Sequence, residues 1–574
     1  MDQARGHSPH ELWGLVARQA WARLRRRLRA GPSYRWRYSG RTPERVLIAP
    51  PDLRIADPQV ARDIYHGQFL LAGQLVETRG QSPFRIPVSD RSWQDALHSF
   101  RWLRHMRAAQ SDLASANARA LVEEWIALYG KRVSGLPWEP GTTARRLIAW
   151  LQHSSVVLQG AELPFYRQFL KMLAVQMRYL RTNAREMPDG EDRLRARIAL
   201  AFCALSLPAP ATAVKAASRN LAQELERQIL ADGGHVSRNP RTIMELLADL
   251  LPLRQTYTNQ AEQPPQALID AVERMLPALR FFRHRDGSIA RFNGMGITQH
   301  DSVAAILRYD DTGGAPLLHA PHSGYERLAL GATTVIADTA PPPSPDLSHF
   351  AHAGCLSFEM SSGRHQFVVN SGIDNYGDDS YRPLARTTAA HSTITLNDTS
   401  QARFSLSSQW SELIGTPLIG GPRKVECHRD DGNGIHRFIA SHNGYVSRFG
   451  LVHERALSLS QDGACLEGVD RICRPDGSPS TAVGDDAVAV RFHIHPDIDI
   501  YRDPEGRHIL AGEATDTWLL TVEDIVPVVE ESIFFAGLGG PRKSRQIVLY
   551  TTASENPEIR WQLRKTHAIN GNGA

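Results

Sequence analysis

Apolar residues recur every three or four positions through most of residues 60–283. This spacing places them along one face of an α-helix, and short Pro/Gly turns separate one such segment from the next. The segments with the clearest pattern are 144–158, 165–180, 193–207, 213–230, 240–253 and 265–282. The pattern predicts consecutive antiparallel helices that pack in pairs, and by itself it allows any helical array.

From about residue 310 the pattern changes to short runs of alternating or continuous β-branched and apolar residues. Turn signals of the Asp-Gly and Asn-Gly type interrupt these runs at 431–432, 443–444, 462–463 and 476–477. Among the runs that we interpret as strands are 333–337, 445–451, 488–494 and 546–550. Many short strands at this spacing predict an antiparallel β-sandwich, so the fold class is α+β and multidomain.

A chain of 574 residues is too long for one hydrophobic core. We predict an N-terminal basic amphipathic helix with an irregular lead-in over 1–59 and a helical domain over 60–283. An interdomain connection over 284–309 leads to a sandwich domain over 310–563, and 564–574 form a loose tail.

The first thirty residues predict an amphipathic helix. Trp13, Val16, Leu24 and Leu28 fall along one side, and arginines crowd the second half. Basic residues beside Trp and Leu favour an anionic membrane surface, so residues 1–30 are a candidate for peripheral membrane contact. A helix that packs on another domain has the same pattern, and both interpretations stay open.

Charge and cysteine content narrow the function classes. A net charge of +5 is small for this length, so the chain is not a basic nucleic-acid binder, whereas an anionic glycan is compatible with it. The five cysteines include no Cys-x-x-Cys pair and predict buried thiols, not a disulfide framework. The sequence shows no secretory signal and no apolar run of membrane-spanning length, which predicts a cytoplasmic protein.

Residues 348–398 hold the most distinctive chemistry. His352, Asn370 and His391 each lie in or beside a strand-like run, which can bring them together on neighbouring strands. Two imidazoles and one oxygen ligand form a plausible site for a divalent metal. The alternative is that the histidines are hydrogen-bonded polar residues of the sheet.

This stretch resembles the sandwich domain of the heparinase II/III family of polysaccharide lyases. The resemblance is in the runs Ala-His-Ala-Gly-Cys-Leu-Ser-Phe from 351, Val-Asn-Ser-Gly from 369 and Arg-Thr-Thr-Ala-Ala-His-Ser-Thr from 386. It implies an incomplete α/α toroid followed by the β-sandwich, and a metal, commonly zinc, at His352, Asn370 and His391. Asn370 replaces the family's aspartate ligand, and Gly354 stands where the first run has Asp.

A second resemblance starts at Asp232-Gly233-Gly234-His235, in a loop that a toroid would open onto its cleft. In the family this segment leads to a catalytic Tyr, whose place is taken here by Thr242. Upstream of this segment, family members have an Asn-His pair that binds the substrate carboxylate. In this chain Glu191 and Asp192 stand at the corresponding positions. Acidic residues there would repel a uronate, although in the first turn of a helix they also favour the helix dipole.

The resemblance implies a lyase that performs β-elimination on an acidic polysaccharide. We assign His235, Tyr376 and His391 to catalysis and Arg238 and Asn239 to substrate binding, because elimination needs proton transfer and charge stabilisation. His235 could instead bond its own turn, and Tyr376 could cap the sheet.

The alternative function is a non-catalytic glycan-binding or cell-envelope protein of the same architecture. It follows from the loss of the Asn-His pair and the Tyr, and the family's periplasmic or envelope location agrees with it. A glycosidase that uses Glu191 and Asp192 is less favoured, because adjacent helix residues point about 100° apart.

Overall fold

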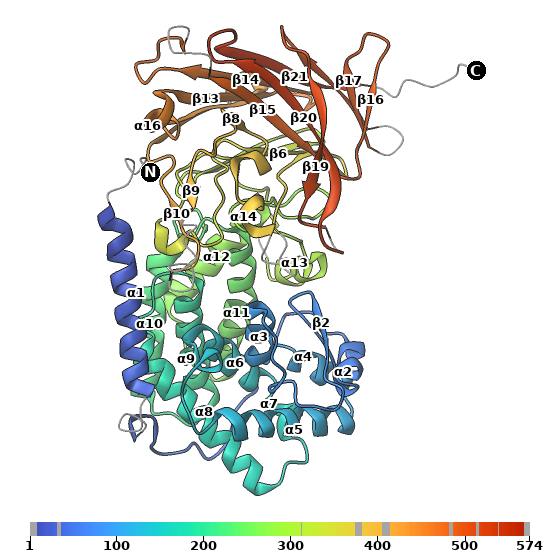
Figure 1. The fold of residues 1–574 in the computed structure, drawn as a ribbon. Coiled ribbons are helices and arrows are strands. Elements are labelled where there is room, and N and C mark those ends of the chain that lie inside the picture. Colours follow the sequence, from blue (N-terminus) through green and yellow to red (C-terminus); the bar gives the residue numbers. More distant parts are fainter. Residues whose placement is uncertain are drawn as a thin grey trace, which may run out of the picture.

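The structure is a computed structural model that describes residues 9–30, 36–310, 313–373, 381–404, 414–480, 486–512, 516–537 and 539–566. The predicted catalytic Tyr376 lies outside these residues. The described chain forms a helical half followed by a β-rich half stacked on one end of it (Figure 1). The α+β fold class is therefore confirmed.

Helices make up most of the first half, with one small hairpin of β1 (Gln68–Leu71) and β2 (Gln74–Glu77). Asn239 caps α11 with its side chain, and Pro240 occupies the first turn, where a missing N–H costs nothing. The helices are α1 Pro9–Ala30, α2 Pro58–Tyr65, α3 Arg91–Ser99, α4 Leu103–Ala109, α5 Asp112–Tyr129, α6 Pro140–Gln152, α7 Ser154–Leu158, α8 Leu163–Asn183, α9 Glu191–Ser206, α10 Ala211–Gln228, α11 Pro240–Asn259, α12 Gln266–Phe281 and α13 His300–Leu307.

The predicted helical segments correspond to α6 to α12, and the segment 144–158 is divided at His153 into α6 and α7. Helix α9 packs against α6, α10 and α11. A toroidal closure of these helices stays a prediction.

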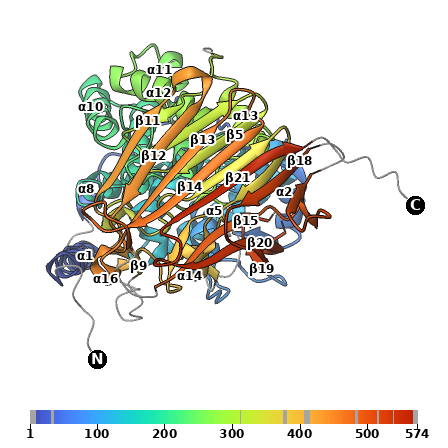
Figure 2. The same ribbon diagram turned by 90° about the horizontal axis from the view of Figure 1, so that it is seen from above.

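Two antiparallel sheets form the second half of the described chain. The nine-stranded sheet runs β19 Val528–Phe534, β20 Arg542–Thr552, β15 Ala487–Ile494, β7 His365–Val369, β6 Phe358–Ser362, β5 Thr333–Asp338, β4 Tyr325–Leu330 and β3 His319–Ala320, with β8 Ile394–Leu396 paired to β15. The eight-stranded sheet, seen from above in Figure 2, runs β11 Val425–Asp430, β12 His436–His442, β13 Val452–Leu459, β14 Cys465–Cys473, β21 Glu558–Thr566, β18 Thr517–Val522, β17 His508–Ala511 and β16 Asp499–Arg502.

The two sheets enclose one apolar core, in which Phe358 stacks on Trp561 with ring centroids 5.6 Å apart. The alternating burial along β14 and β21 is the pattern of strands with one face on a core. This arrangement is a β-sandwich, as predicted. Small elements in its loops are α14 Arg382–Ala385, α16 Val446–Phe449, β9 Arg403–Phe404, β10 Leu418–Ile419 and the 3₁₀ turns Pro345–Leu347, Thr388–Ala390 and Gly432–Gly434, while Leu136–Trp138 is a similar turn in the helical half.

Two details of the sequence prediction differ from the structure. The run 445–451 was predicted as a strand, but residues Val446–Phe449 form α16, and Gly450 ends that helix in the left-handed conformation with φ 69°. Its short apolar pattern fits either element, and the left-handed glycine decides for the helix. The predicted tail begins at 564, whereas β21 continues to Thr566, and residues 567–574 lie outside the described part.

The helical and sandwich halves share a buried boundary, because the helical core extends to Tyr325 of β4 and Ile336 of β5. Helix α1 lies along one side of the molecule (Figure 1). It contacts both halves: Leu15 and Val16 pack on Ile414, and Arg29 bonds Glu186 beyond α8. Among the described helices, none is both long and apolar enough to cross a bilayer.

Candidate functional site

The loop between α10 and α11 carries His235, the first predicted catalytic residue. The amide of Ser237 donates to Nδ1 of His235 at 3.1 Å, so the ring proton lies on Nε2 and donates to Oε1 of Gln228 at 2.9 Å. The ring is buried, and this burial lowers the pKa of His235 to about 4. Both ring nitrogens are therefore used within the turn and the helix that precedes it.

Arg238 and Asn239, the predicted substrate-binding residues, lie at the boundary between the two halves. The guanidinium of Arg238 forms an ion pair of 2.5 Å with Asp338 and stacks over the Tyr325 ring at 4.9 Å. The side chain of Asn239 accepts from the amide of Arg241 at 2.9 Å and so caps α11. Arg238 also donates to the carbonyl oxygens of Ser323, Gly324, Ala340 and Pro341.

The structure brings together the two places where the family resemblance puts substrate-gripping and catalytic residues. The hydroxyl of Thr242 donates to Oε2 of Glu191 at 3.4 Å, across a sequence separation of 51 residues. Glu191 is paired with Arg195 at 2.5 Å, and the adjacent Asp192 with Arg145 at 2.6 Å. The two acids thus contact different arginines and do not face one another across a cleft, as a glycosidase pair would.

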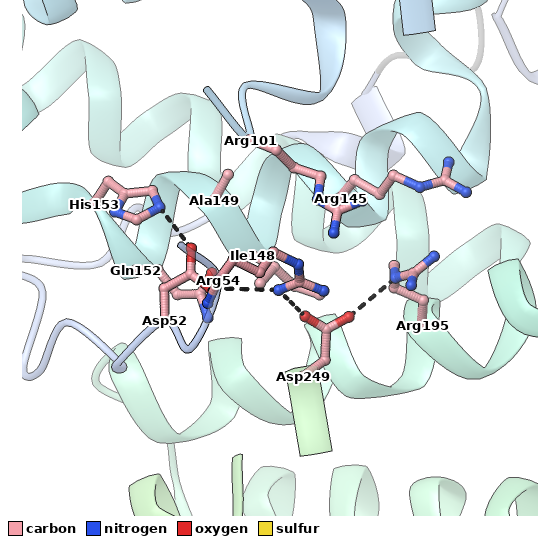
Figure 3. Close-up of a pocket in the computed structure, with 10 residues that line it drawn as sticks. All are labelled: Asp52, Arg54, Arg101, Arg145, Ile148, Ala149, Gln152, His153, Arg195 and Asp249. Atoms are coloured by element: carbon pink, nitrogen blue, oxygen red, sulfur yellow. Dashed lines mark hydrogen bonds and ion pairs between the residues drawn. The ribbon is translucent and has the colours of Figure 1, made fainter. Parts of the chain in front are cut away.

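Arg195, the partner of Glu191, belongs to a network of charges between helices of the helical half (Figure 3). The side chain of Glu191 itself is 32% exposed. Asp249 bonds Nε of Arg195 at 3.0 Å and Nη1 of Arg54 at 2.7 Å, and Glu245 bonds Arg101 at 2.6 Å. The network surrounds a cavity of about 10 Å³, room for about one water molecule. The residues that line this cavity are Asp52, Arg54, Arg101, Arg145, Ile148, Ala149, Gln152, His153, Arg195 and Asp249.

Burial by itself would raise the pKa of Glu191, but Arg195 and Arg145 outweigh that effect and lower the pKa to about 2. Glu191 is therefore a carboxylate at neutral pH. Arg195 and Arg145, the two arginines nearest to this position, are thus engaged by carboxylates of the chain itself.

His352 and His391, the predicted metal ligands, are in direct contact. Nδ1 of His352 lies 2.9 Å from Nε2 of His391. The other nitrogen of His352 accepts from the amide of Gly294 at 3.1 Å, and Nδ1 of His391 bonds the carbonyl of Thr387 at 2.7 Å. The sequence prediction that these two histidines lie together is therefore reproduced in the geometry.

Asn370, the third predicted ligand, lies beside the pair. Its Oδ1 accepts from the backbone amide of Ser392 at 3.0 Å, and its backbone N–H donates to Glu359 at 2.9 Å. Gly354 packs on His391, since a Cβ atom at this position would lie 2.7 Å from Cδ2 of His391. The backbone is too close to the ring for the aspartate that the family has here.

Comparison with known proteins identifies the family of this chain. Residues 312–562 match the family described as Heparinase II/III-like, C-terminal. Over 569 residues the chain is 30% identical to FtsZ-localized protein C of Caulobacter vibrioides (strain NA1000 / CB15N), which covers 96% of each protein. The chain belongs to the heparinase II/III family. Its architecture is accordingly that of a polysaccharide lyase.

Solved structures of heparinase II/III lyases share the fold. Heparinase III matches with a TM-score of 0.70 at 14% identity, over 93% of this chain and 89% of the other. The heparan sulfate lyase HepC of Pedobacter heparinus matches with a TM-score of 0.59 at 16% identity, over 98% and 89% of the two chains. At such identities the likeness extends to the fold alone.

The residues present fit the metal of the heparinase II/III family poorly. Within the described residues, no group of three or more His, Cys, Asp and Glu side chains is arranged to hold a metal ion. The third donor is the neutral amide of Asn370, whose oxygen already accepts a backbone N–H. Zinc at His352, Asn370 and His391 therefore stays a prediction.

Sequence reasoning missed the part of the charge network that comes from the N-terminal segment. Asp52 and Arg54 lie in a stretch without periodicity, and Arg54 pairs with Asp249, which is far away in the chain. No motif connects the two positions. The available signal was the pair of acids at 191 and 192 that replaces Asn-His, and both acids do pair with arginines in the structure.

Buried neutral histidines give an expected dependence of stability on pH. Burial lowers the pKa of His235 to about 4 and that of His493 to about 3. An unfolded histidine takes up a proton below pH ~6.5, so between ~6.5 and the folded pKa the unfolded state binds more protons. Each such residue should therefore destabilise the fold by up to about 1.4 kcal/mol per pH unit as the pH falls through this window.

Urea denaturation at pH 7 and pH 5 measures this effect. The midpoint should be lower at pH 5, and His235→Gln should reduce the difference, whereas His322→Gln, at an exposed position, should leave it unchanged. Equal midpoints at the two pH values for the wild type would contradict the assignment of neutral buried histidines.

Proposed function

We propose that this chain is a non-catalytic member of the heparinase II/III family that acts as a binding protein at the cell envelope. The observation that carries the proposal is the ion-paired Glu191 at the place where the lyases hold the substrate carboxylate. The chain keeps the lyase-like architecture, but the position that binds the substrate carboxylate in the lyases holds an acidic residue here.

Electrostatics oppose elimination at this position. Elimination requires groups that stabilise the negative charge which develops when the proton beside the uronate carboxylate is removed. Arg195 is already paired with Glu191 and Arg145 with Asp192, so neither guanidinium faces this position without a carboxylate beside it. Glu191 would therefore weaken the binding of a uronate where the family's Asn-His pair strengthens it.

Within the described residues, the predicted proton-transfer groups His235 and His391 are engaged in hydrogen bonds. A general base needs a lone pair within reach of the substrate. The lone pair of His235 accepts from Ser237, and His391 is buried with both nitrogens in hydrogen bonds. Thr242, in place of the catalytic Tyr, donates to Glu191.

The relative of similar length suggests the partner. FtsZ-localized protein C is named for its location with FtsZ, and its similarity to this chain extends over both domains. We therefore propose FtsZ as a protein partner of this chain, and an acidic glycan as the alternative ligand that the lyase-like architecture suggests.

Two measurements on the purified chain test the function. The ultraviolet absorbance of unsaturated uronate products should not rise with heparan sulfate, hyaluronan, alginate or bacterial uronate polysaccharides, with or without zinc. Biolayer interferometry should detect binding to purified FtsZ. A rising absorbance that is lost in His391→Ala would contradict the non-catalytic assignment. Absence of binding to FtsZ would contradict the proposal that FtsZ is a partner.

β-Elimination on an acidic polysaccharide is the second candidate function. It is favoured by the likeness in fold to heparinase III and HepC over almost the whole chain. The absorbance assay decides between the two candidates.

Helix α1 supports a further contact of this protein, with an anionic membrane surface. Its buried face holds Leu15 and Val16, so the prediction that Val16 shares a side with Trp13 and Leu28 is wrong. On the other side, Trp13, Trp21 and Leu28 are 59%, 55% and 66% exposed. Exposed apolar residues separated by seven or eight positions share one face of a helix. Because α1 is attached through its opposite face, the exposed stripe can enter a lipid interface while the helix stays packed.

Arginines flank this stripe. Arg25 stacks on Trp21 at 5.0 Å, and Arg18 has its side chain 70% exposed. Basic residues beside interfacial Trp and Leu attract anionic lipid headgroups, with about 1 kcal/mol for each residue near the surface. We propose the docking of α1 on an anionic bilayer as the peripheral membrane contact.

Vesicle flotation checks the α1 proposal. The chain should float with phosphatidylglycerol-containing vesicles and not with phosphatidylcholine vesicles, and the bound fraction should fall with added salt. Trp21→Glu with Leu28→Glu should lower the affinity at least tenfold. Leu70→Glu, at a leucine that is 63% exposed on β1, is the matched control and should bind as the wild type does. Equal flotation of both variants would contradict the assignment of α1.

A further inference from the structure

The position of the family's metal site is held by hydrogen bonds whose direction can be assigned. The amide of Gly294 can only donate, so Nε2 of His352 accepts and carries no proton. Neutral His352 therefore has its proton on Nδ1 and donates to Nε2 of His391. His391 in turn has its proton on Nδ1 and donates to the carbonyl of Thr387.

We propose that the metal site of the family has become, in this chain, a metal-free hydrogen-bonded lock between the interdomain connection and the sandwich. The lock consists of Gly294, His352, His391 and Thr387, in that order of donation. All four ring nitrogens take part in it.

The tautomer of His352 opposes a metal. A metal ion between the two rings would bind Nδ1 of His352 and Nε2 of His391, the two nitrogens that face each other. Nδ1 of His352 would then lose its proton, and in a neutral ring that proton would move to Nε2. The proton on Nε2 would then face the N–H of Gly294. Two hydrogen-bond donors that face each other at a buried position cost about 1–3 kcal/mol.

The surrounding residues fit the lock better than a metal. The Oδ1 atom of Asn370 is already an acceptor for Ser392, and an amide is a weaker ligand than the carboxylate of the family. Gly354 leaves no room for the second acidic side chain, since its Cβ would lie 2.7 Å from the His391 ring.

The lock joins segments that are far apart in sequence. Gly294 follows α12, and the neighbouring Asn293 accepts from the amide of His352 at 3.2 Å and donates to Asp338 at 3.0 Å. His391 precedes β8. The histidines therefore fix the connection between the halves to the sandwich, a role that requires no catalysis and no metal.

Histidine-selective ¹⁵N NMR of the full chain tests the tautomers directly. Resonances assigned with His352→Gln and His391→Gln should both show the tautomer with the proton on Nδ1, and one equivalent of zinc should leave them unshifted. His322→Gln is the control for assignment. A coordinated Nδ1 at His352 after zinc addition would overturn the proposal.

Thermal unfolding gives a second readout. His391→Phe should lower Tm by about 5 °C. The decrease should be the same in the presence of zinc and in the presence of a chelator. The Tm of the wild type should also be the same in these two conditions. Metal analysis of the wild type should find substoichiometric zinc. Stoichiometric zinc, or a Tm of the wild type that falls in chelator, would show that the site holds a metal. If His391→Phe does not fold, the wild-type measurements and the NMR experiment still decide.

Discussion

Replacement of Arg238 by methionine is expected to lower the free energy of unfolding by about 3–5 kcal/mol, the usual cost of removing one partner of a buried ion pair. The guanidinium is buried and pairs with Asp338 at 2.5 Å. It also donates to carbonyl oxygens of four residues on either side of β4 and β5. Without it, the carboxylate of Asp338 and those carbonyls lose a donor at a position that water does not reach.

Chemical denaturation followed by tryptophan fluorescence measures the loss. Arg364→Met is the matched control, because Arg364 is exposed in the turn between β6 and β7, and its change should stay within about 0.5 kcal/mol. The 11 tryptophans of the chain are distributed over both halves, so the fluorescence signal reports on the whole molecule. A loss below about 1 kcal/mol for Arg238→Met would show that the residue is not a structural tie and would return it to the substrate-binding role that the sequence predicts.

The fold could be predicted from the sequence because its signals are local. The periodic segments became α6 to α12, and the turn-separated runs became strands of the sandwich. The prediction failed at 445–451, where a short apolar run fits either element and Gly450 ends a helix. Such a run contains too few residues for its period to decide.

The candidate site could be predicted only where motifs carry positional information. The resemblance assigned Glu191 and Thr242 to positions that serve the substrate in the family, and the structure adds that their side chains lie 3.4 Å apart. It also paired His352 with His391. The use of these side chains could not be predicted, because it depends on long-range partners: Arg54 for Asp249, and the backbone amide of Gly294 for His352. A backbone donor has no signature in the amino-acid sequence.

Asp249→Leu is expected to lower the free energy of unfolding by about 3–5 kcal/mol, because it leaves two buried arginines without one of their carboxylates. Asp249 bonds Arg54 at 2.7 Å and Arg195 at 3.0 Å. The side chains of Asp249 and Arg195 are each 2% exposed, and that of Arg54 is 12% exposed. Urea denaturation measures the change, and Asp499→Leu, at an exposed aspartate on β16, gives the corresponding effect outside the network. Since buried pairs are screened little by salt, the loss should be similar at low and high ionic strength.

The double variant Arg54→Met with Asp249→Leu tests whether the charges form one network. It removes one cation and one anion together, so fewer charges are left buried without a partner than in either single variant. The double variant should therefore lose less stability than the sum of the two single losses, with a coupling of about 1–3 kcal/mol. Additive losses would mean that the two charges act independently. Strong coupling would show that Asp249 and Arg54 act as one network that serves the packing of the helical half.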